Sequence, residues 1–202
     1  MTEAAEIIFL VDDDSAVLRA VSRLLRSAGY AVRGFLSAEA FMAAHNADTP
    51  GCLVVDIAMP GATGLELQEW LFQSQSSLPV IFLTGCGDIP STVRAMKGGA
   101  VDFLSKPVDE ADLLGAVRAG LQQGRLLRIK RSDHARAQEL LGTLTARERE
   151  VFDHLLTGRL NKQIAADLGT VEKTIKVHRA RVLRKLGVSS IAELVRLAER
   201  AR

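Results

Sequence analysis

Four short apolar runs in the first half of the chain end on, or lead directly into, polar residues that could do chemistry. Runs of this length predict buried strands of a parallel sheet, and the carboxyl ends of such strands meet at one edge. We therefore expect the polar residues at these ends to lie close together. The runs and their end residues are Ile7–Val11 with Asp12, Asp13 and Asp14, Cys52–Val55 with Asp56, Leu78–Thr84 with Thr84 itself, and Val101–Leu104 with Lys106.

Carboxylates at such an edge destabilise one another unless positive charge compensates them, because neighbouring like charges raise each other's pKa. A hard cation such as Mg²⁺, which takes oxygen ligands, and the ammonium group of Lys106 are two sources of that charge. The hydroxyl of Thr84 adds a donor for a phosphoryl oxygen. Each residue alone is also typical of a helix cap or a turn, but their combination at four strand ends predicts a pocket for Mg²⁺ and a phosphoryl group.

Strand-like and helix-like segments alternate through the first 120 residues. Continuous apolar strands interleaved with helices indicate a parallel sheet that is covered on both faces. The pattern predicts a doubly wound, flavodoxin-like α/β fold of the (βα)5 kind. The expected strands are the four runs above and Tyr30–Phe35, and the expected helices are Ser15–Ala28, Ala38–Asn46, Leu65–Ser74, Ser91–Lys97 and one that opens at Asp109.

The remainder of the chain is helical in pattern. Thr145 to Glu148 and Ser190 to Glu193 have the spacing of a capping box, and Gly187 is placed to end a helix. These signals predict a small all-α domain with a helix-turn-helix. We expect Asn161 to cap a short helix Lys162–Leu168, Gly169 to break it, and a longer helix to run over Glu172–Leu186.

Charge divides the chain in the same place as the secondary structure. Residues 1–118 contain 15 Asp and Glu against 8 Lys and Arg, a formal charge of −7, whereas residues 119–202 contain 9 against 18, a charge of +9. A basic half is expected to meet a polyanion. We predict an α/β domain over residues 1–120, a linker over 121–142 that is helical in part, and a helix-turn-helix domain over 143–202.

Composition and the chain start restrict the class of protein. The apolar content of 48% suits folded cores, and no apolar run is long enough to span a membrane. The first residues lack the basic segment of a signal peptide, so we expect a cytoplasmic protein. Cys52 and Cys86 are too few and too isolated for a zinc site or a disulfide framework.

The expected helix Glu172–Leu186 has one apolar and one cationic face when it is drawn at 100° per residue. Small apolar side chains among the cations suit contact with thymine methyl groups in a DNA major groove, whereas an isolated cationic face would be typical of a solvated surface. The short helix and turn before it place this helix as the recognition element of a helix-turn-helix. The residues of the cationic face are Lys173, Lys176, Val177, Ala180, Arg181 and Arg184.

Residues 7–120 resemble the receiver domain of two-component response regulators. The resemblance is carried by Val11-Asp12-Asp13-Asp14, Asp56-Ile57-Ala58-Met59-Pro60 with Gly64, Thr84-Gly85 and Lys106-Pro107. It implies that Asp56 accepts a phosphoryl group from a sensor histidine kinase. It further implies that Mg²⁺ is held by Asp12, Asp13, Asp56 and the backbone carbonyl of Ala58, that Thr84 and Lys106 grip the phosphoryl oxygens, that Phe103 is an aromatic switch, and that the Lys106-Pro107 bond is cis.

Residues 143–198 resemble the LuxR-type DNA-binding domain of NarL/FixJ-class regulators. Leu144–Val151, Asn161–Ala165 and Thr174–Arg179 carry the resemblance. It implies base contacts at Lys176, Val177 and Ala180; the short side chain of Ala180 moves some of this role to Arg181. The two resemblances together imply a DNA-binding transcriptional regulator, not an enzyme, with a histidine kinase, promoter DNA and RNA polymerase as partners. We further expect a homodimer formed on phosphorylation, because one small basic domain with few base contacts should bind DNA weakly.

The sequence departs from these families at a few positions. Cys86 and Gly61 stand where a histidine or aromatic residue and an acidic residue, respectively, are frequent. Val171 stands where a serine usually caps the recognition helix, and Thr170 is an alternative cap with a shifted helix start.

Two other classes of protein are alternatives to a regulator. A phosphatase of the haloacid-dehalogenase kind would use Asp56 as nucleophile, but it would carry a second acid at the position of Ala58 and a lid domain. A binding module that works without phosphate would have a degenerate pocket, whereas all five pocket residues are present here.

Overall fold

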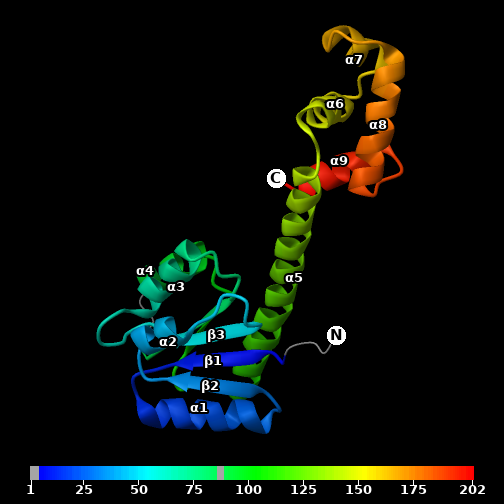
Figure 1. Cartoon of the computed structure of the whole chain (residues 1–202). Helices are drawn as coiled ribbons and strands as arrows, with labels where there is room; N and C mark the ends of the chain where they lie inside the picture. The colour runs from blue at the N-terminus through cyan, green and yellow to red at the C-terminus, as the bar shows by residue number, and fades with distance from the viewer. Residues whose placement is uncertain (1–4, 86–88) are drawn as a thin grey trace. The chain divides into compact units, whose positions relative to one another are not determined.

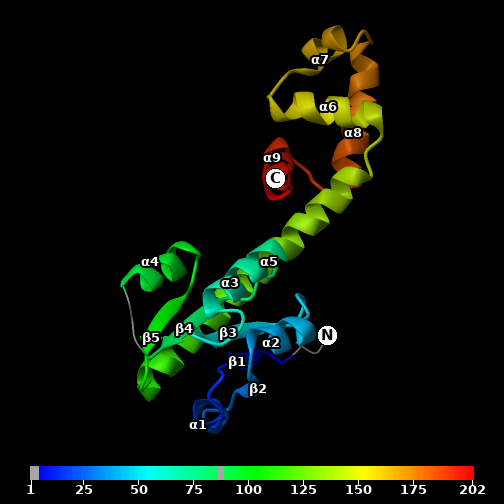
Figure 2. The same ribbon diagram turned by 90° about the vertical axis from the view of Figure 1, so that its left-hand side faces the viewer.

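The computed structural model describes residues 5–85 and 89–202, and the chain divides into two compact units, residues 1–128 and 129–202. The first unit is an α/β domain built on a five-stranded parallel sheet of order β2-β1-β3-β4-β5 (Figures 1 and 2). Its strands are β1 (Ile7–Val11), β2 (Ala31–Phe35), β3 (Gly51–Asp56), β4 (Val80–Thr84) and β5 (Asp102–Ser105). Its helices are α1 (Ser15–Ser27), α2 (Ala38–Ala44), α3 (Gly64–Gln73), α4 (Ile89–Lys97) and the first part of α5 (Glu110–Gly142).

Helices cover both faces of the sheet because alternate strand residues point to opposite sides. Phe9, Leu53 and Phe82 belong to a core that includes residues of α2, α3 and α4. Their neighbours Ile8, Val54 and Ile81, among others, belong to a second core that includes residues of α1 and α5. This arrangement confirms the predicted doubly wound flavodoxin-like fold, with strand and helix ends within two residues of most of the expected positions.

Helix α5 differs from the expectation of a partly helical linker, since it continues without a break to Gly142. Gly120 and Gly124, one helical turn apart, are where α5 packs against the sheet. A Cβ at Gly120 would lie 3.3 Å from the Cβ of Cys52, and one at Gly124 would lie 3.1 Å from the carbonyl oxygen of Gly51. Here, therefore, glycine allows a close helix–sheet approach and does not end the helix.

The second unit contains the last turns of α5 and the helices α6 (Ala146–Leu156), α7 (Asn161–Asp167), α8 (Glu172–Leu186) and α9 (Ile191–Arg200). They enclose one core, to which α8 contributes Ile175, Val182 and Leu186. The predicted all-α domain and the bounds of its longest helix are thus confirmed. Of the helices in the described residues, none is both long and apolar enough to cross a membrane.

Two predictions about helix starts were wrong. Asn161 is the first residue of α7, not its cap; Leu160 holds the cap position, and its N–H donates to Gln163 Oε1 at 2.9 Å. Helix α8 starts at Glu172 after Val171, without a side-chain cap and without the shift to Thr170.

The structure agrees better with the predicted capping boxes and with the predicted end of α8. Thr145 and Glu148 form the predicted box, and Gly187 ends α8 with a φ of 65°. Ser190 accepts from the N–H of Glu193, but the carboxylate of Glu193 accepts from Ser189 instead of Ser190.

Candidate functional site

The carboxyl ends of β1 and β3 bring two aspartates side by side. Val11 pairs with Val55 in the parallel ladder, so Asp12 and Asp56 occupy neighbouring positions at the same edge. Asp13 completes a group in which one carboxylate oxygen from each of the three residues lies within 4.8 Å of the others. Asp12 and Asp56 are buried and Asp13 is exposed, so this group opens to solvent on one side. The sequence placed these carboxylates together correctly.

Lys106 bridges the two buried carboxylates. Its Nζ donates to Asp12 Oδ2 at 2.6 Å and to Asp56 Oδ2 at 2.7 Å. Lys106 directly follows β5, and its backbone N–H donates a hydrogen bond to the carbonyl of Thr84 at the end of β4. The peptide bond from Lys106 to Pro107 is cis, as the resemblance implied. Residues 94 and 50 positions apart in the chain thus meet in one charged cluster.

Burial and charge act in opposite directions on this cluster. Burial raises the pKa of Asp12, and the hydrogen bonds from Lys106 and from the backbone N–H of Asp14 only partly offset it. Burial also disfavours the Lys106 ammonium, but its hydrogen bonds to the two carboxylates outweigh this and keep the pKa of Lys106 above its usual value. Asp12 is a buried carboxylate that shares its cationic partner, Lys106, with Asp56, so the site can accommodate the charge of a further hard cation. The three side chains would all offer carboxylate oxygens as metal ligands, which is the ligand type that Mg²⁺ prefers.

The other predicted pocket residues lie at the same edge. Thr84 is buried at the end of β4, where Leu83 pairs with Asp56, so its position is one residue beyond the aspartate. Ala58 is exposed, and its N–H donates to Asp56 Oδ1 at 3.3 Å. Phe103 on β5 pairs with Phe82 on β4 and is half-buried against the core that includes residues of α2, α3 and α4. Cys86, with Gly87 and Asp88, lies outside the described residues.

One carboxylate near this edge was missed by the sequence reasoning. Glu39 on α2 accepts from the N–H of Ala62 at 2.9 Å, and a Cβ at Gly61 would lie 2.6 Å from its Oε1. The loop between β3 and α3 is therefore held by a residue 23 positions earlier in the chain. No local pattern identifies such a contact, because it depends on how α2 packs beside that loop.

The cationic face predicted for α8 is exposed along its whole length. All six residues of this face, among them Lys173, Arg181 and Arg184, are accessible, and Val177 is 45% exposed between them. Lys176 forms an exposed ion pair with Glu172 of the first turn at 3.2 Å. The opposite side of α8 is buried in the core, so the surface available to a polyanion is the face that the sequence predicts.

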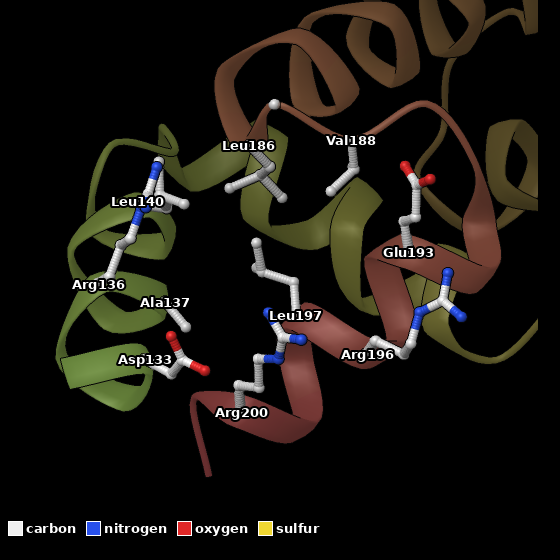
Figure 3. Close-up of a pocket in the computed structure, with 11 residues that line it drawn as sticks. Asp133, Arg136, Ala137, Leu140, Leu186, Val188, Glu193, Arg196, Leu197 and Arg200 are labelled. Atoms are coloured by element: carbon white, nitrogen blue, oxygen red, sulfur yellow. The ribbon is translucent and has the colours of Figure 1, made fainter. Parts of the chain in front are cut away.

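Two sets of contacts hold α8 in place. Lys185 donates to Glu148 Oε2 on α6 at 2.6 Å and to the carbonyl of Thr143. The other set is apolar: Leu186 of α8 and Val188 just after it share one core with Leu197 of α9 and Leu140 of α5. Figure 3 shows these side chains around a pocket that they line together. His134 and Gln138 of α5 also contact the final carbonyls of α9, at Arg200 and Ala201.

Comparison with known protein families assigns each unit. The family described as "Response regulator receiver domain" matches residues 8–118. The family described as "Bacterial regulatory proteins, luxR family" matches residues 142–198.

Individual relatives share both units. The response regulator protein TodT of Pseudomonas putida is 45% identical over 203 residues, which cover 99% of this chain and 88% of TodT. The transcriptional regulatory protein FixJ of Azorhizobium caulinodans is 44% identical over 95% of this chain and 90% of FixJ. Among solved structures, the response regulator StyR has a TM-score of 0.84 at 45% identity, covering 97% of this chain and 99% of StyR. Full-length FixJ from B. japonicum has a TM-score of 0.60 at 38% identity, covering 98% of each chain.

Proposed function

The chain belongs to the two-component response regulators that join a receiver domain to a LuxR-family DNA-binding domain, and we propose that Asp56 is the residue its sensor histidine kinase phosphorylates. Such regulators control transcription and are not enzymes, which agrees with the sequence-based expectation. We assign the receiver to residues 1–120 and the DNA-binding domain to 143–202, joined by the part of α5 over 121–142.

The observation that carries the proposal is the bridge from Lys106 to both buried aspartates. Phosphoryl transfer to a carboxylate asks mainly for position and for neutralised charge. An oxygen of Asp56 forms the new P–O bond while the P–N bond to the kinase histidine breaks and the imidazole leaves. Lys106, already within hydrogen-bond distance of Asp56, then faces the phosphoryl oxygens, and Thr84 supplies a hydroxyl at the adjoining strand end.

The same pocket is the proposed Mg²⁺ site. Asp12, Asp13, Asp56 and the carbonyl of Ala58 would hold the ion. When bound, Mg²⁺ neutralises charge that develops on the transferred group. Asp13 is the exposed member of the set, so it also leaves the site open toward solvent and toward a donor.

We further propose that the exposed face of α8 contacts promoter DNA. Lys176, Val177 and Ala180 would meet base edges, and Lys173, Arg181 and Arg184 would contact either bases or phosphates. The charge of +9 over residues 119–202 supports binding to a polyanion. RNA polymerase is the expected partner of the protein once it is bound at a promoter.

Coupling between the units is proposed to use a receiver dimer. A single small module with few base contacts should bind DNA with a Kd of roughly 10⁻⁴–10⁻⁶ M at physiological salt. Two linked modules gain a factor of roughly 10²–10⁴ from effective concentration. In this proposal the phosphoryl group draws Thr84 inward, Phe103 fills the vacated space, and the surface of α4 and β5 becomes a dimer interface.

A phosphorylation experiment tests the pocket. The wild-type chain and Asp56→Asn would be treated with acetyl phosphate and Mg²⁺ and followed by mass spectrometry. We expect one stable phosphoryl adduct on the wild type and none on the variant, because the amide is not a nucleophile. Equal labelling of both proteins refutes the assignment of Asp56, continuous phosphate release indicates a phosphatase, and no adduct on either indicates a module that works without phosphate.

Sedimentation and DNA footprinting on the same samples test the coupling. Phosphorylated protein should sediment as a dimer at micromolar concentration and protect its site more strongly than the unmodified protein. A phosphorylated monomer that nevertheless binds its site tightly contradicts the dimer proposal.

A further inference from the structure

The receiver unit has a strongly exposed aromatic side chain on α3, a helix that the proposed function does not use. Phe72 on α3 is 82% exposed, the largest fraction among the exposed large hydrophobic residues of the described chain. It lines a hollow of about 360 Å³ between α3 and α4, which we call the α3–α4 groove. Residues lining the groove are Leu65, Gln68, Glu69 and Phe72 of α3, and Arg94, Lys97 and Gly98 at the end of α4.

The walls of the α3–α4 groove are fixed against each other. Gln68 is buried, and its Nε2 donates to the carbonyl of Ala95 on α4 at 3.1 Å. A Cβ at Gly98 would lie 2.5 Å from Gln68 Oε1, so a larger residue there would displace either the Gln68 amide or the end of α4. A groove that already exists in the free protein needs little reorganisation to accept an occupant.

The charges around Phe72 are of both signs and face solvent. Glu69 is exposed, and its carboxylate accepts a 3.5 Å hydrogen bond from Gln73 on the same helix. Arg94 and Lys97 are exposed on the opposite wall, where the charge of Arg94 helps to lower the pKa of Glu66 on α3. The groove thus presents an apolar side chain, one acid and two bases.

This mixture restricts the occupant. A purely acidic partner would be repelled by Glu69, and the basic half of this chain would be repelled by Arg94 and Lys97. A surface that carries the same groups in the same arrangement satisfies both walls when it is turned by a two-fold axis, because each residue then contacts its complement on the other copy.

We propose that the α3–α4 groove is an isologous docking surface for a second copy of this chain. Phe72 of each copy enters the groove of the other, and Glu69 of each faces Lys97 and Arg94 of the other. This contact uses α3 and the side of α4 that carries Arg94 and Lys97, and it does not involve β5, so it differs from the α4–β5 interface proposed for the phosphorylated receiver. Two different two-fold contacts on one subunit extend an assembly beyond a dimer, which would favour joint occupancy of neighbouring DNA sites.

Sedimentation velocity of the full-length, unphosphorylated chain tests the contact directly. A small interface of this kind should give a concentration-dependent dimer with a Kd on the order of 10⁻⁵–10⁻⁴ M. Phe72→Ser should raise that Kd at least about tenfold, since it removes the central apolar side chain. The matched control is Leu36→Ser, which changes a side chain that is 54% exposed at the β2–α2 turn, outside the groove.

A charge-swap mixture separates docking between copies from an effect within one copy. Glu69→Lys alone and Lys97→Glu alone should each weaken self-association, because each homodimer places like charges opposite each other. An equal mixture of the two variants should restore it, since both contacts in the heterodimer then join opposite charges. The control mixture is Glu139→Lys with Lys130→Glu, which makes the same net charge changes at exposed positions of α5.

The proposal is overturned if the wild-type chain stays monomeric at submillimolar concentration, or if Phe72→Ser and Leu36→Ser behave alike. It is also overturned if the charge-swap mixture associates no better than either variant alone, or no better than the control mixture. Restored association in the charge-swap mixture only, together with a specific loss in Phe72→Ser, supports the proposed contact.

Discussion

The ion pair between the buried carboxylate of Glu148 and the exposed Lys185 should make the stability of the DNA-binding unit depend on pH. The Glu148 side chain is 5% exposed and accepts hydrogen bonds from Lys185 Nζ at 2.6 Å, from the N–H of Thr145 at 2.9 Å and from its hydroxyl at 3.1 Å. The Lys185 hydrogen bond, followed by those from Thr145, lowers the pKa of Glu148 from 4.5 to about 2. The carboxylate is therefore favoured in the folded state.

The magnitude follows from linkage between proton binding and folding. A pKa that is lower in the folded state stabilises the fold above the unfolded value of 4.5, and this contribution is lost as pH falls toward 2. The full shift corresponds to about 3 kcal/mol at 1.36 kcal/mol per pKa unit. Solvent around the exposed Lys185 screens the interaction, so we expect the pair to contribute about 1–3 kcal/mol to the free energy of unfolding at neutral pH.

Urea unfolding of the full chain at several pH values measures this contribution. Trp70 is the only tryptophan and lies in the receiver unit, so its fluorescence reports that unit alone, whereas circular dichroism reports both. Glu148→Gln should lower the stability of the second unit by about 1–3 kcal/mol at pH 7 and by much less near pH 3, while the Trp70 transition stays unchanged. Equal stability of variant and wild type at pH 7 would refute the reasoning. The same loss at both pH values would show that hydrogen-bond geometry matters and charge does not.

Three further outcomes are expected. Asp13→Ala should weaken Mg²⁺ binding, followed by calorimetry or Trp70 fluorescence, because it removes one oxygen ligand; an unchanged affinity moves the metal elsewhere. Gly64→Ala should destabilise the receiver in thermal unfolding, since its Cβ would lie 2.4 Å from the carbonyl oxygen of Asp56; Gly34→Ala, whose nearest neighbour is a flexible Leu18 methyl at 3.3 Å, should cost far less. Arg181→Gln should reduce the slope of log K against log salt for DNA binding by about 0.9 if it contacts one phosphate. An unchanged slope in fluorescence anisotropy titrations would show that Arg181 does not contact a phosphate.

Much of the fold was predictable because the strands and helices follow from local patterns of apolar and polar residues. Continuous apolar runs gave the strands, helical spacing gave the helices, and the alternation of the two gave a doubly wound sheet. Helix α8 was predicted over its whole length from its apolar face and Gly187. Local signals failed where two residues could fill one role, as at the start of α7, where Gln163 accepts from the N–H of Leu160 and Asn161 lies inside the helix.

The sequence by itself determined which residues end the strands, and therefore that Asp12, Asp56, Thr84 and Lys106 share one edge of the sheet. Only the tertiary structure decided that a single ammonium group bridges both buried aspartates, because that depends on the order β1-β3-β4-β5 and on the path of the chain after β5.

Contacts between residues far apart in the chain were likewise decided by packing alone. Glu6 pairs with Arg125 and Arg128 across 119 and 122 positions, and Glu39 reaches the loop at Ala62. The continuation of α5 as one unbroken helix past Gly120 also follows from packing, since glycine there fits the helix closely against the sheet. Local patterns encode the conformation of neighbouring residues, but which distant side chains meet is fixed only when the elements pack and exclude water.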